Sequence, residues 1–183
     1  MKFSVFIATS LDGYVADTDG RIGWLLDFTR QVPDDEDCGY QEFLTGMDAL
    51  VIGRRALEQA LCFPEWPYGD RPVFVVSREL QSLPADLPAS VTLETRTPRE
   101  LARHLQKLGY RHAFLDDEQL IRGFLRHDLI ETLTITTVPV LLGDGVPLFG
   151  RLGVTLGLQL EACQAYPFGF VQSRYRVLPP PRH

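Results

Sequence analysis

The chain has few cysteines and no long apolar run. Its 183 residues include three cysteines, Cys38, Cys62 and Cys163, which are widely spaced and form no Cys-x-x-Cys pair. This pattern predicts three reduced thiols, with no disulfide framework and no metal site. No stretch reaches the roughly 18 to 20 apolar residues that a membrane-spanning helix needs, and the N-terminal apolar run is too short for a signal peptide. These absences predict a cytoplasmic protein with no membrane partner.

The chain also lacks any run of lysine or arginine. Eighteen basic residues stand against 24 acidic ones, and the formal net charge is −6. A nucleic-acid surface has to neutralise phosphates, so no nucleic-acid partner is expected, although small anionic ligands could bind through local basic residues. With 45% hydrophobic and 23% charged residues, the length and composition predict a single globular domain over residues 1–178 and a tail over 179–183.

Short apolar strands alternate with helical patterns along the chain. Strands are predicted at 3–9, 48–53, 72–76, 91–94, 112–115 and 131–141, followed by a hairpin within 156–178. Helices are predicted to begin at Pro33, Ala56, Thr97 and Glu118. This alternation favours an α/β fold with a mostly parallel sheet and helices on both faces, and the closing hairpin makes the sheet mixed.

The strand and helix at 112–127 meet in a turn that carries three acids, Asp116, Asp117 and Glu118. In open α/β sheets, nucleotides usually lie at the carboxyl end of a strand beside a helix N-terminus. This turn has no glycine. Its acids could be helix caps, each worth about 0.3–1 kcal/mol at an exposed site, or they could face a ligand.

Basic residues follow two other predicted strands. The strand at 48–53 ends in Gly53 and is followed by Arg54 and Arg55, and Ser77 and Arg78 come after the strand at 72–76. Guanidinium groups can bind a phosphate through paired hydrogen bonds. The alternative is that these are ordinary surface residues.

Several strings of the sequence resemble a known family. They are FIATSLDGYVA at 6–16, GWL at 23–25, VIGRR at 51–55, VFVVSR at 73–78 and LIRGFLRHDLIETLTITTVPVLLGDGVPLF at 120–149. The chain resembles proteins of the dihydrofolate reductase fold, and more closely the C-terminal reductase domain of bacterial riboflavin-biosynthesis deaminase-reductases and its stand-alone homologues. The resemblance implies a three-layer α/β fold with a mixed, mostly parallel eight-stranded sheet, and a homodimer.

The resemblance also implies NADPH as the cofactor and assigns residues to it. Ala8 would contact the nicotinamide ring, and Asp12 would be the catalytic candidate in the loop over the reaction centre, where it could orient a substrate group or relay a proton. As a turn residue, Asp12 could equally be structural. The cofactor phosphates would be held by Gly53, Arg54, Arg55, Ser77, Arg78, Asp116, Asp117 and Glu118.

Two positions depart from the family pattern. Relatives usually have a hydroxyl residue where this chain has Ala56, and paired glycines where it has Asp117 and Glu118. A like-charged pair about 4 Å apart at an effective dielectric near 20 costs about 4 kcal/mol, or roughly a thousandfold in affinity. NADPH binding is therefore in doubt, unless the acids turn outward as caps or the cofactor shifts toward the arginines.

Two functions from different classes follow. The first is an NADPH-dependent reductase of the riboflavin-pathway type that transfers hydride to a small pteridine-like or pyrimidine-like heterocycle. The second is a non-catalytic binding protein of the same fold that has lost NADPH because Asp117 and Glu118 replace the glycines. Folate is not the expected substrate, since no acid matches the folate-binding carboxylate. Candidates for the apolar walls of the substrate site are Trp24, Phe28, Phe43 and Leu44, each of which could instead belong to the core.

Overall fold

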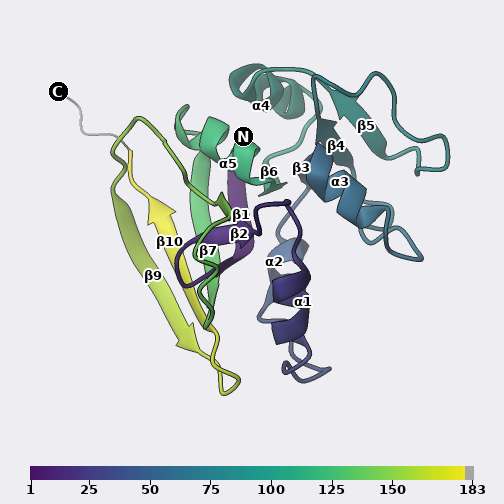
Figure 1. Ribbon diagram of the computed structural model, residues 1–183. Helices are drawn as coiled ribbons and strands as arrows, with labels where there is room; N and C mark the ends of the chain where they lie inside the picture. Colours follow the sequence, from purple (N-terminus) through teal and green to yellow (C-terminus); the bar gives the residue numbers. More distant parts are fainter. Residues whose placement is uncertain (180–183) are drawn as a thin grey trace.

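The computed structural model describes residues 1–179 (Figure 1). Of the predicted tail, residues 180–183 lie outside the described part. The strands are β1 (Lys2–Ser10), β2 (Tyr14–Ala16), β3 (Ala49–Gly53), β4 (Val73–Val76), β5 (Val91–Glu94), β6 (His112–Asp116), β7 (Ile130–Val138), β8 (Val146–Pro147), β9 (Leu158–Ala165) and β10 (Val171–Val177). The helices are α1 (Gly23–Thr29), α2 (Tyr40–Thr45), α3 (Arg54–Ala60), α4 (Pro98–Lys107) and α5 (Glu118–Leu125).

The main sheet has eight strands in the order β5-β4-β3-β6-β1-β7-β10-β9. The pairs from β5 to β7 are parallel, and β10 pairs antiparallel with both β7 and β9. This arrangement confirms the predicted mixed, mostly parallel sheet. The carboxyl ends of the parallel strands β1, β3, β4 and β6 therefore lie next to one another, and the candidate site lies there.

Helices cover both faces of the sheet, which gives three layers (Figure 1). The strand β3 is buried on both faces and needs a helix layer on each, because alternate residues of a strand point to opposite faces. Ala49 and Val51 belong to the core cluster on the face covered by α4 and α5. Leu50 and Ile52 belong to the cluster on the other face, which α2 and α3 cover.

The second helix is shorter than predicted. It begins at Tyr40 and not at Pro33, because the chain turns just before it. Cys38 and Gly39 adopt left-handed backbone conformations, with φ of 54° and 80°. The Asp37 carboxylate stabilises this turn by accepting a hydrogen bond from the N–H of Gly39 at 2.8 Å. The acidic segment therefore forms a turn, from which Asp37 also accepts a hydrogen bond from the N–H of Gln41, where a helical first turn was expected.

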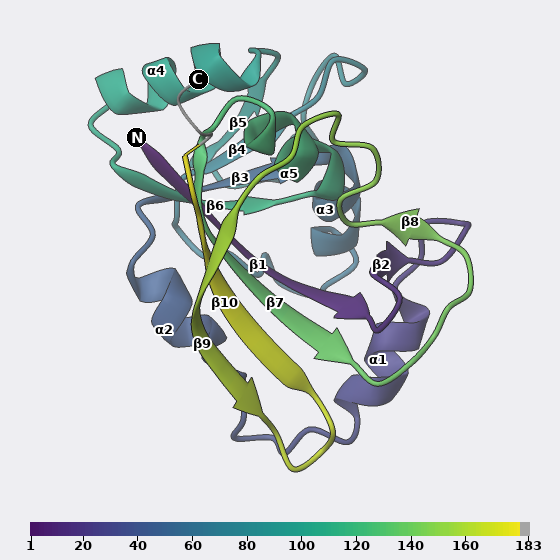
Figure 2. The same ribbon diagram turned by 90° about the vertical axis from the view of Figure 1, so that its left-hand side faces the viewer.

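The strand predicted to reach residue 141 ends at Val138, since Pro139 has no N–H to donate to the sheet. A small antiparallel sheet of β2 and β8, which was not predicted, joins the segments that follow β1 and β7 (Figure 2). The helix α1 was also not predicted. Within residues 1–179, no helix has the length and apolar character needed to cross a membrane.

Candidate functional site

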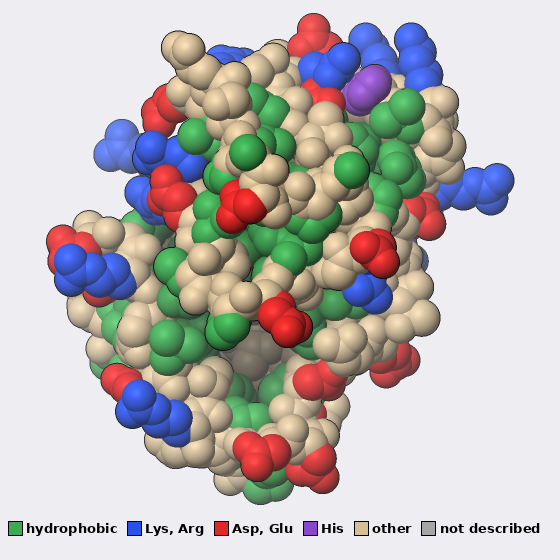
Figure 3. Space-filling view, turned by 90° about the vertical axis from the view of Figure 1, so that its right-hand side faces the viewer, with side chains coloured by type: hydrophobic (Ala, Val, Ile, Leu, Met, Phe, Trp, Pro, Cys, Tyr) green, Lys and Arg blue, Asp and Glu red, His purple; other side chains and the backbone are tan. Residues whose placement is uncertain are grey.

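Two cavities open where the parallel strands end. One, of about 200 Å³, lies beside β1, and the other, of about 490 Å³, lies beside β4. Arg55 and Asp117 line both, so the β6–α5 turn stands where the two cavities meet. On the side of the molecule that carries α1, α2 and α3, the surface is hollowed between hydrophobic side chains, with acidic side chains around the hollow (Figure 3). Ligands of open α/β sheets bind at the carboxyl ends of the strands, which makes this pair of cavities the candidate site.

The Asp117 carboxylate occupies the N-terminus of α5. Its Oδ1 accepts hydrogen bonds from the backbone N–H groups of Gln119 at 2.9 Å and Leu120 at 3.0 Å. The carboxylate also faces β3, because a Cβ atom added to Gly53 would lie 1.9 Å from Asp117 Oδ2. Burial raises the pKa of Asp117, while its two backbone hydrogen bonds act in the opposite direction. The side chain is a cap, but it points into the cleft and takes up the N–H groups that a phosphate would use.

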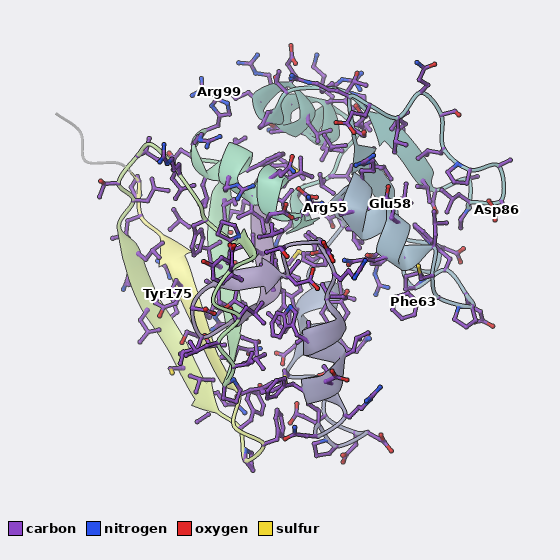
Figure 4. The ribbon with its side chains drawn as sticks, in the orientation of Figure 1. Arg55, Glu58, Phe63, Asp86, Arg99 and Tyr175 are labelled. Atoms are coloured by element: carbon purple, nitrogen blue, oxygen red, sulfur yellow. The ribbon has the colours of Figure 1, made fainter. Side chains whose placement is uncertain are left out.

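Glu118 also turns inward. Its side chain is buried, and its Oε1 accepts a hydrogen bond from Arg55 Nη1 at 3.1 Å. Arg55 lies in the space between α3, which carries it, and α5 (Figure 4). The positive charge of Arg55 is therefore neutralised within the chain.

Asp116 is the last residue of β6 and lines the smaller cavity. Burial, together with the negative charges of Asp117 and Glu118, raises the pKa of Asp116 to about 7. A carboxyl group with this pKa is partly protonated at neutral pH, so it can either accept or donate a hydrogen bond to a ligand.

The walls of the smaller cavity are mostly apolar. Ala8 and Ala56 both line it, and the contact of Ala8 with a nicotinamide ring remains a prediction. Sequence reasoning missed Ile22, Leu25 and Gln59, which complete the wall from the α1 region and from α3. Ile22 and Leu25 carried no recognisable signal because α1 itself was not predicted.

The larger cavity is lined by arginines. Arg54, Arg55 and Arg78 border it together with Gly53 and Ser77, as the resemblance implies for a phosphate site. Arg54 is engaged by two acids, Glu58 at 3.7 Å and Glu79 at 3.3 Å. Ser77 Oγ accepts hydrogen bonds from the N–H groups of Glu79 and Leu80, so it shapes the turn after β4.

Arg96 is a further arginine of the larger cavity that sequence reasoning missed. It follows β5 by two residues and pairs with Glu94, which is 2% exposed. Its signal was present in the sequence, since Arg78 was singled out for the same position, two residues after a strand.

Asp12 lies outside both cavities. Its Oδ1 accepts hydrogen bonds from Ser10 Oγ at 2.6 Å and from the N–H of Leu142, and its Oδ2 accepts one from the N–H of Gly143 at 2.8 Å. The bond from Ser10 is the main reason that the pKa of Asp12 lies below its usual value. These contacts make Asp12 a link between two loops, and its catalytic role remains a prediction.

The four predicted wall residues do not line the smaller cavity. Trp24 and Phe28 pack in a cluster with Tyr166 and other apolar residues near the end of β7, and Leu44 is the buried residue of α2 that packs on the sheet. Phe43 borders a separate cavity of about 550 Å³ between α2 and the strands β9 and β10. Their role in substrate binding remains a prediction.

Comparison with known proteins identifies the family. The model of the RibD C-terminal domain matches residues 2–171. The chain belongs to the RibD C-terminal domain family. It is 31% identical to the uncharacterized protein YwjB of Bacillus subtilis over 167 residues, which cover 90% of this chain and 92% of YwjB.

Solved structures of similar proteins agree with this assignment. A Shewanella protein assigned to riboflavin biosynthesis has a TM-score of 0.89 and 35% identity, covering 98% of this chain and 100% of that one. The deaminase-reductase of Thermotoga maritima, with a TM-score of 0.67 and 15% identity over 96% of this chain and 56% of its own, shares the fold. The predicted likeness to the reductase domain is thus confirmed at the level of family and fold.

NADPH, the cofactor that the resemblance implies, fits only part of this cleft. The apolar cavity at Ala8 and the arginine-lined cavity beside β4 have the character that a nicotinamide ring and a phosphorylated adenosine require. The turn between them does not suit a diphosphate, because Asp117 already occupies the N–H groups of α5 and fills the space against Gly53. Among residues 1–179, no group of three or more His, Cys, Asp or Glu side chains is placed to hold a metal ion.

Proposed function

We propose that this RibD-family chain binds a small pteridine-like or pyrimidine-like heterocycle in the cavity beside β1, and that it does not hold NADPH across α5. The observation that carries this proposal is the position of the Asp117 carboxylate, which supplies from within the chain the anion that α5 and the Gly53 turn would otherwise receive from a diphosphate. The function is therefore that of a binding protein with a reductase-like fold.

The cavity beside β1 has the chemistry for such a ligand. Ala8, Ile22 and Leu25 offer apolar surfaces to a planar ring, and Asp116 offers a carboxyl group to a ring N–H or an amino group. Ligand sites of this kind combine apolar walls with a few placed polar groups. At about 200 Å³, the cavity has room for a small ring system but not for a whole dinucleotide.

Calorimetry with the full chain tests the proposal. A series of aminopyrimidines and pterins should include micromolar ligands, and Asp116→Asn should weaken them while Asp86→Asn, at an exposed loop position, should not. NADPH should give no heat of binding at millimolar concentration. The proposal would be overturned if NADPH bound with micromolar affinity. It would also be overturned if neither Asp116→Asn nor Asp86→Asn changed the affinity for the heterocycle.

A second candidate is the NADPH-dependent reductase, and a specific observation favours it. The larger cavity brings Arg78 and Arg96 next to Ser77, a set of donors suited to a phosphorylated nucleoside. The Thermotoga relative is described as a 5-amino-6-(5-phosphoribosylamino)uracil reductase, and the same reaction type would apply here. NADPH should then be consumed on mixing with an aminopyrimidine, which is measured as the loss of the absorbance of reduced nicotinamide at about 340 nm. Such consumption would establish this candidate over the first.

A further inference from the structure

A third cavity, of about 550 Å³, lies between α2 and the strands β9 and β10 (Figure 2). Its lining shares Phe6 with the cavity beside β1 and shares no residue with the cavity beside β4. A hydrogen bond joins two of its walls, because Gln172 Nε2 on β10 donates to the carbonyl of Cys38, in the turn before α2, at 3.0 Å. The proposed function makes no use of this cavity.

The floor of the third cavity carries hydroxyl groups from β1 and β7. Ser4 Oγ lies 2.7 Å from His112 Nε2 and 2.6 Å from Thr132 Oγ1, so these two hydroxyls are paired. Thr134, two residues further along β7, faces the same side of the sheet and is 6% exposed. Within the described part of the chain, no group forms a hydrogen bond with the Thr134 hydroxyl. Because buried hydroxyls are usually paired, that of Thr134 is available to a molecule in the cavity.

The walls of the third cavity carry more negative than positive charge. Glu36 and Glu42 line the wall made by α2 and the turn before it, and neither forms an ion pair with a basic side chain of the residues that the structure describes. Glu36 is held in place, since its Oε1 accepts a hydrogen bond from the N–H of Cys38 at 2.6 Å. On the opposite wall, Glu161 is neutralised by Arg174 at 3.7 Å. The unpaired carboxylates therefore lie on the α2 side.

Apolar surface adjoins these carboxylates. Phe43 belongs to α2, as Glu42 does, and its ring packs against Phe6 with the ring centroids 5.1 Å apart. Met47 also lines this side of the cavity. Carboxylates beside aromatic rings favour an organic cation, because the ammonium group pairs with the carboxylates while its carbon atoms lie on the rings.

We infer that the third cavity binds a small primary amine that carries a hydroxyl group. The ammonium group pairs with Glu36 and Glu42, the apolar body lies along Phe6 and Phe43, and the hydroxyl group reaches Thr134 at the floor. The cavity volume is typical of sites for small molecules. Because the cavity beside β1 is separate, both ligands can be bound at once.

Calorimetry with the full chain gives the first test. The probes are three hydroxylated amines, namely tyramine, octopamine and ethanolamine. At least one should bind with a dissociation constant below about 1 mM. Acetylation of its nitrogen removes the positive charge and should weaken binding by about tenfold or more. Binding by none of the three amines, or equal binding of the acetylated form, would overturn the inference.

The role of the carboxylates is tested by Glu42→Gln. This variant should bind the amine about tenfold more weakly, because the ammonium group loses a charged partner. Glu65→Gln is the matched control, since both glutamates are exposed and each substitution removes one negative charge, but Glu65 does not line the cavity. Equal losses of affinity in the two variants would contradict the assignment.

The role of the floor is tested by Thr134→Val, which keeps the shape of the side chain and removes its hydroxyl. The hydroxylated amine should bind about threefold more weakly or worse, whereas the same amine without its hydroxyl group should bind as it does to the wild type. Thr137→Val, on the opposite face of β7, should affect neither amine. Equal losses for both amines in Thr134→Val would contradict the contact with the hydroxyl group.

Cys163 allows a measurement that needs no variant. Its thiol is free and exposed and lines the third cavity, whereas that of Cys62 is free and exposed outside it. At ten times its dissociation constant, the bound amine should slow the reaction of Cys163 with iodoacetamide by about tenfold and leave Cys62 unchanged. Mass spectrometry of the labelled peptides measures both rates. Binding that leaves Cys163 unprotected would place the amine elsewhere and overturn the inference.

Discussion

Two strand-to-helix turns lie side by side at the carboxyl ends of the parallel strands, and their side chains carry opposite charges. The β3–α3 turn ends in Gly53 and begins its helix with two arginines, while the β6–α5 turn carries three carboxyl groups. The strands β3 and β6 are neighbours, and the Asp117 carboxylate lies against Gly53. The first turn carries positive side chains, and the second turn carries a carboxylate that lies against it. On the function proposed above, the negative turn closes to NADPH a site whose positive half is still present.

The largest effect is expected from removing the acids of the second turn. Asp117→Gly combined with Glu118→Gly should raise the affinity for NADPH by about a thousandfold, because the like-charge repulsion is removed and Arg55 is freed. Calorimetry measures the change. The matched control is Asp34→Gly with Asp35→Gly, which alters the net charge equally at two exposed positions and should leave NADPH affinity unchanged. No gain in a folded double variant would show that the two turns are not opposed in this way.

The contact between Asp117 and Gly53 can also be tested by changing Gly53, in the β3–α3 turn. Gly53→Ala should lower the free energy of unfolding by about 1–3 kcal/mol, because the new methyl group enters the space of the Asp117 carboxylate. Asp117→Gly should restore most of that loss, as a double-mutant cycle in urea would measure. Gly23→Ala is the control, since a Cβ there meets nothing within 4 Å. If the two substitutions were additive, the close approach would not exist.

The crowding of carboxyl groups should appear in the pH dependence of stability. The pKa of Asp116 rises from 3.8 to about 7 on folding, so the folded chain binds this proton more tightly than the unfolded chain. The bound proton of Asp116 therefore stabilises the folded chain. This stabilisation is complete below pH 4 and is lost as the pH rises toward 7. The free energy of unfolding of the wild type should fall relative to Asp116→Asn by about 1–2 kcal/mol over this range, less than full linkage predicts because neighbouring acids titrate together. Parallel curves for the two chains would contradict the assignment.

The smallest effect concerns the cap alone. Asp117→Ala should destabilise the chain by about 1 kcal/mol, whereas Asp117→Asn should change its stability little, because asparagine accepts the same hydrogen bonds. Thermal unfolding compares the two variants. Equal losses would mean that the charge of Asp117, and not its hydrogen bonds, stabilises α5.

The sequence was sufficient to predict the elements that build the site. The strands before Gly53 and Asp116 are apolar runs that end in polar clusters, and such boundaries are readable from the chain alone. The helix α1 was missed because Ile22 at its start is not a capping residue and its first turn contains no acid. The strands β2 and β8, of three and two residues, are too short to show a period.

Whether the side chains of Asp117 and Glu118 face the cleft or the solvent could not be predicted. Asp117 can cap α5 whether its carboxylate faces the cleft or the solvent, so local rules do not choose between them. The choice depends on Gly53, which is 64 positions away along the chain and leaves room for the carboxylate only once β3 and β6 are paired. The partner of Glu118 is Arg55, from the same distant turn.

The link made by Asp12 has a practical meaning for loop grafting. Hydrogen bonds join the segment after β1 to the segment after β7 at several points, among them Asp12 with Gly143 and the N–H of Leu148 with the carbonyl of Gly13. A designer who replaced only one of these segments with that of a relative would leave the other without its partners. Residues 11–16 and 139–148 therefore form one exchangeable module and have to be transplanted together.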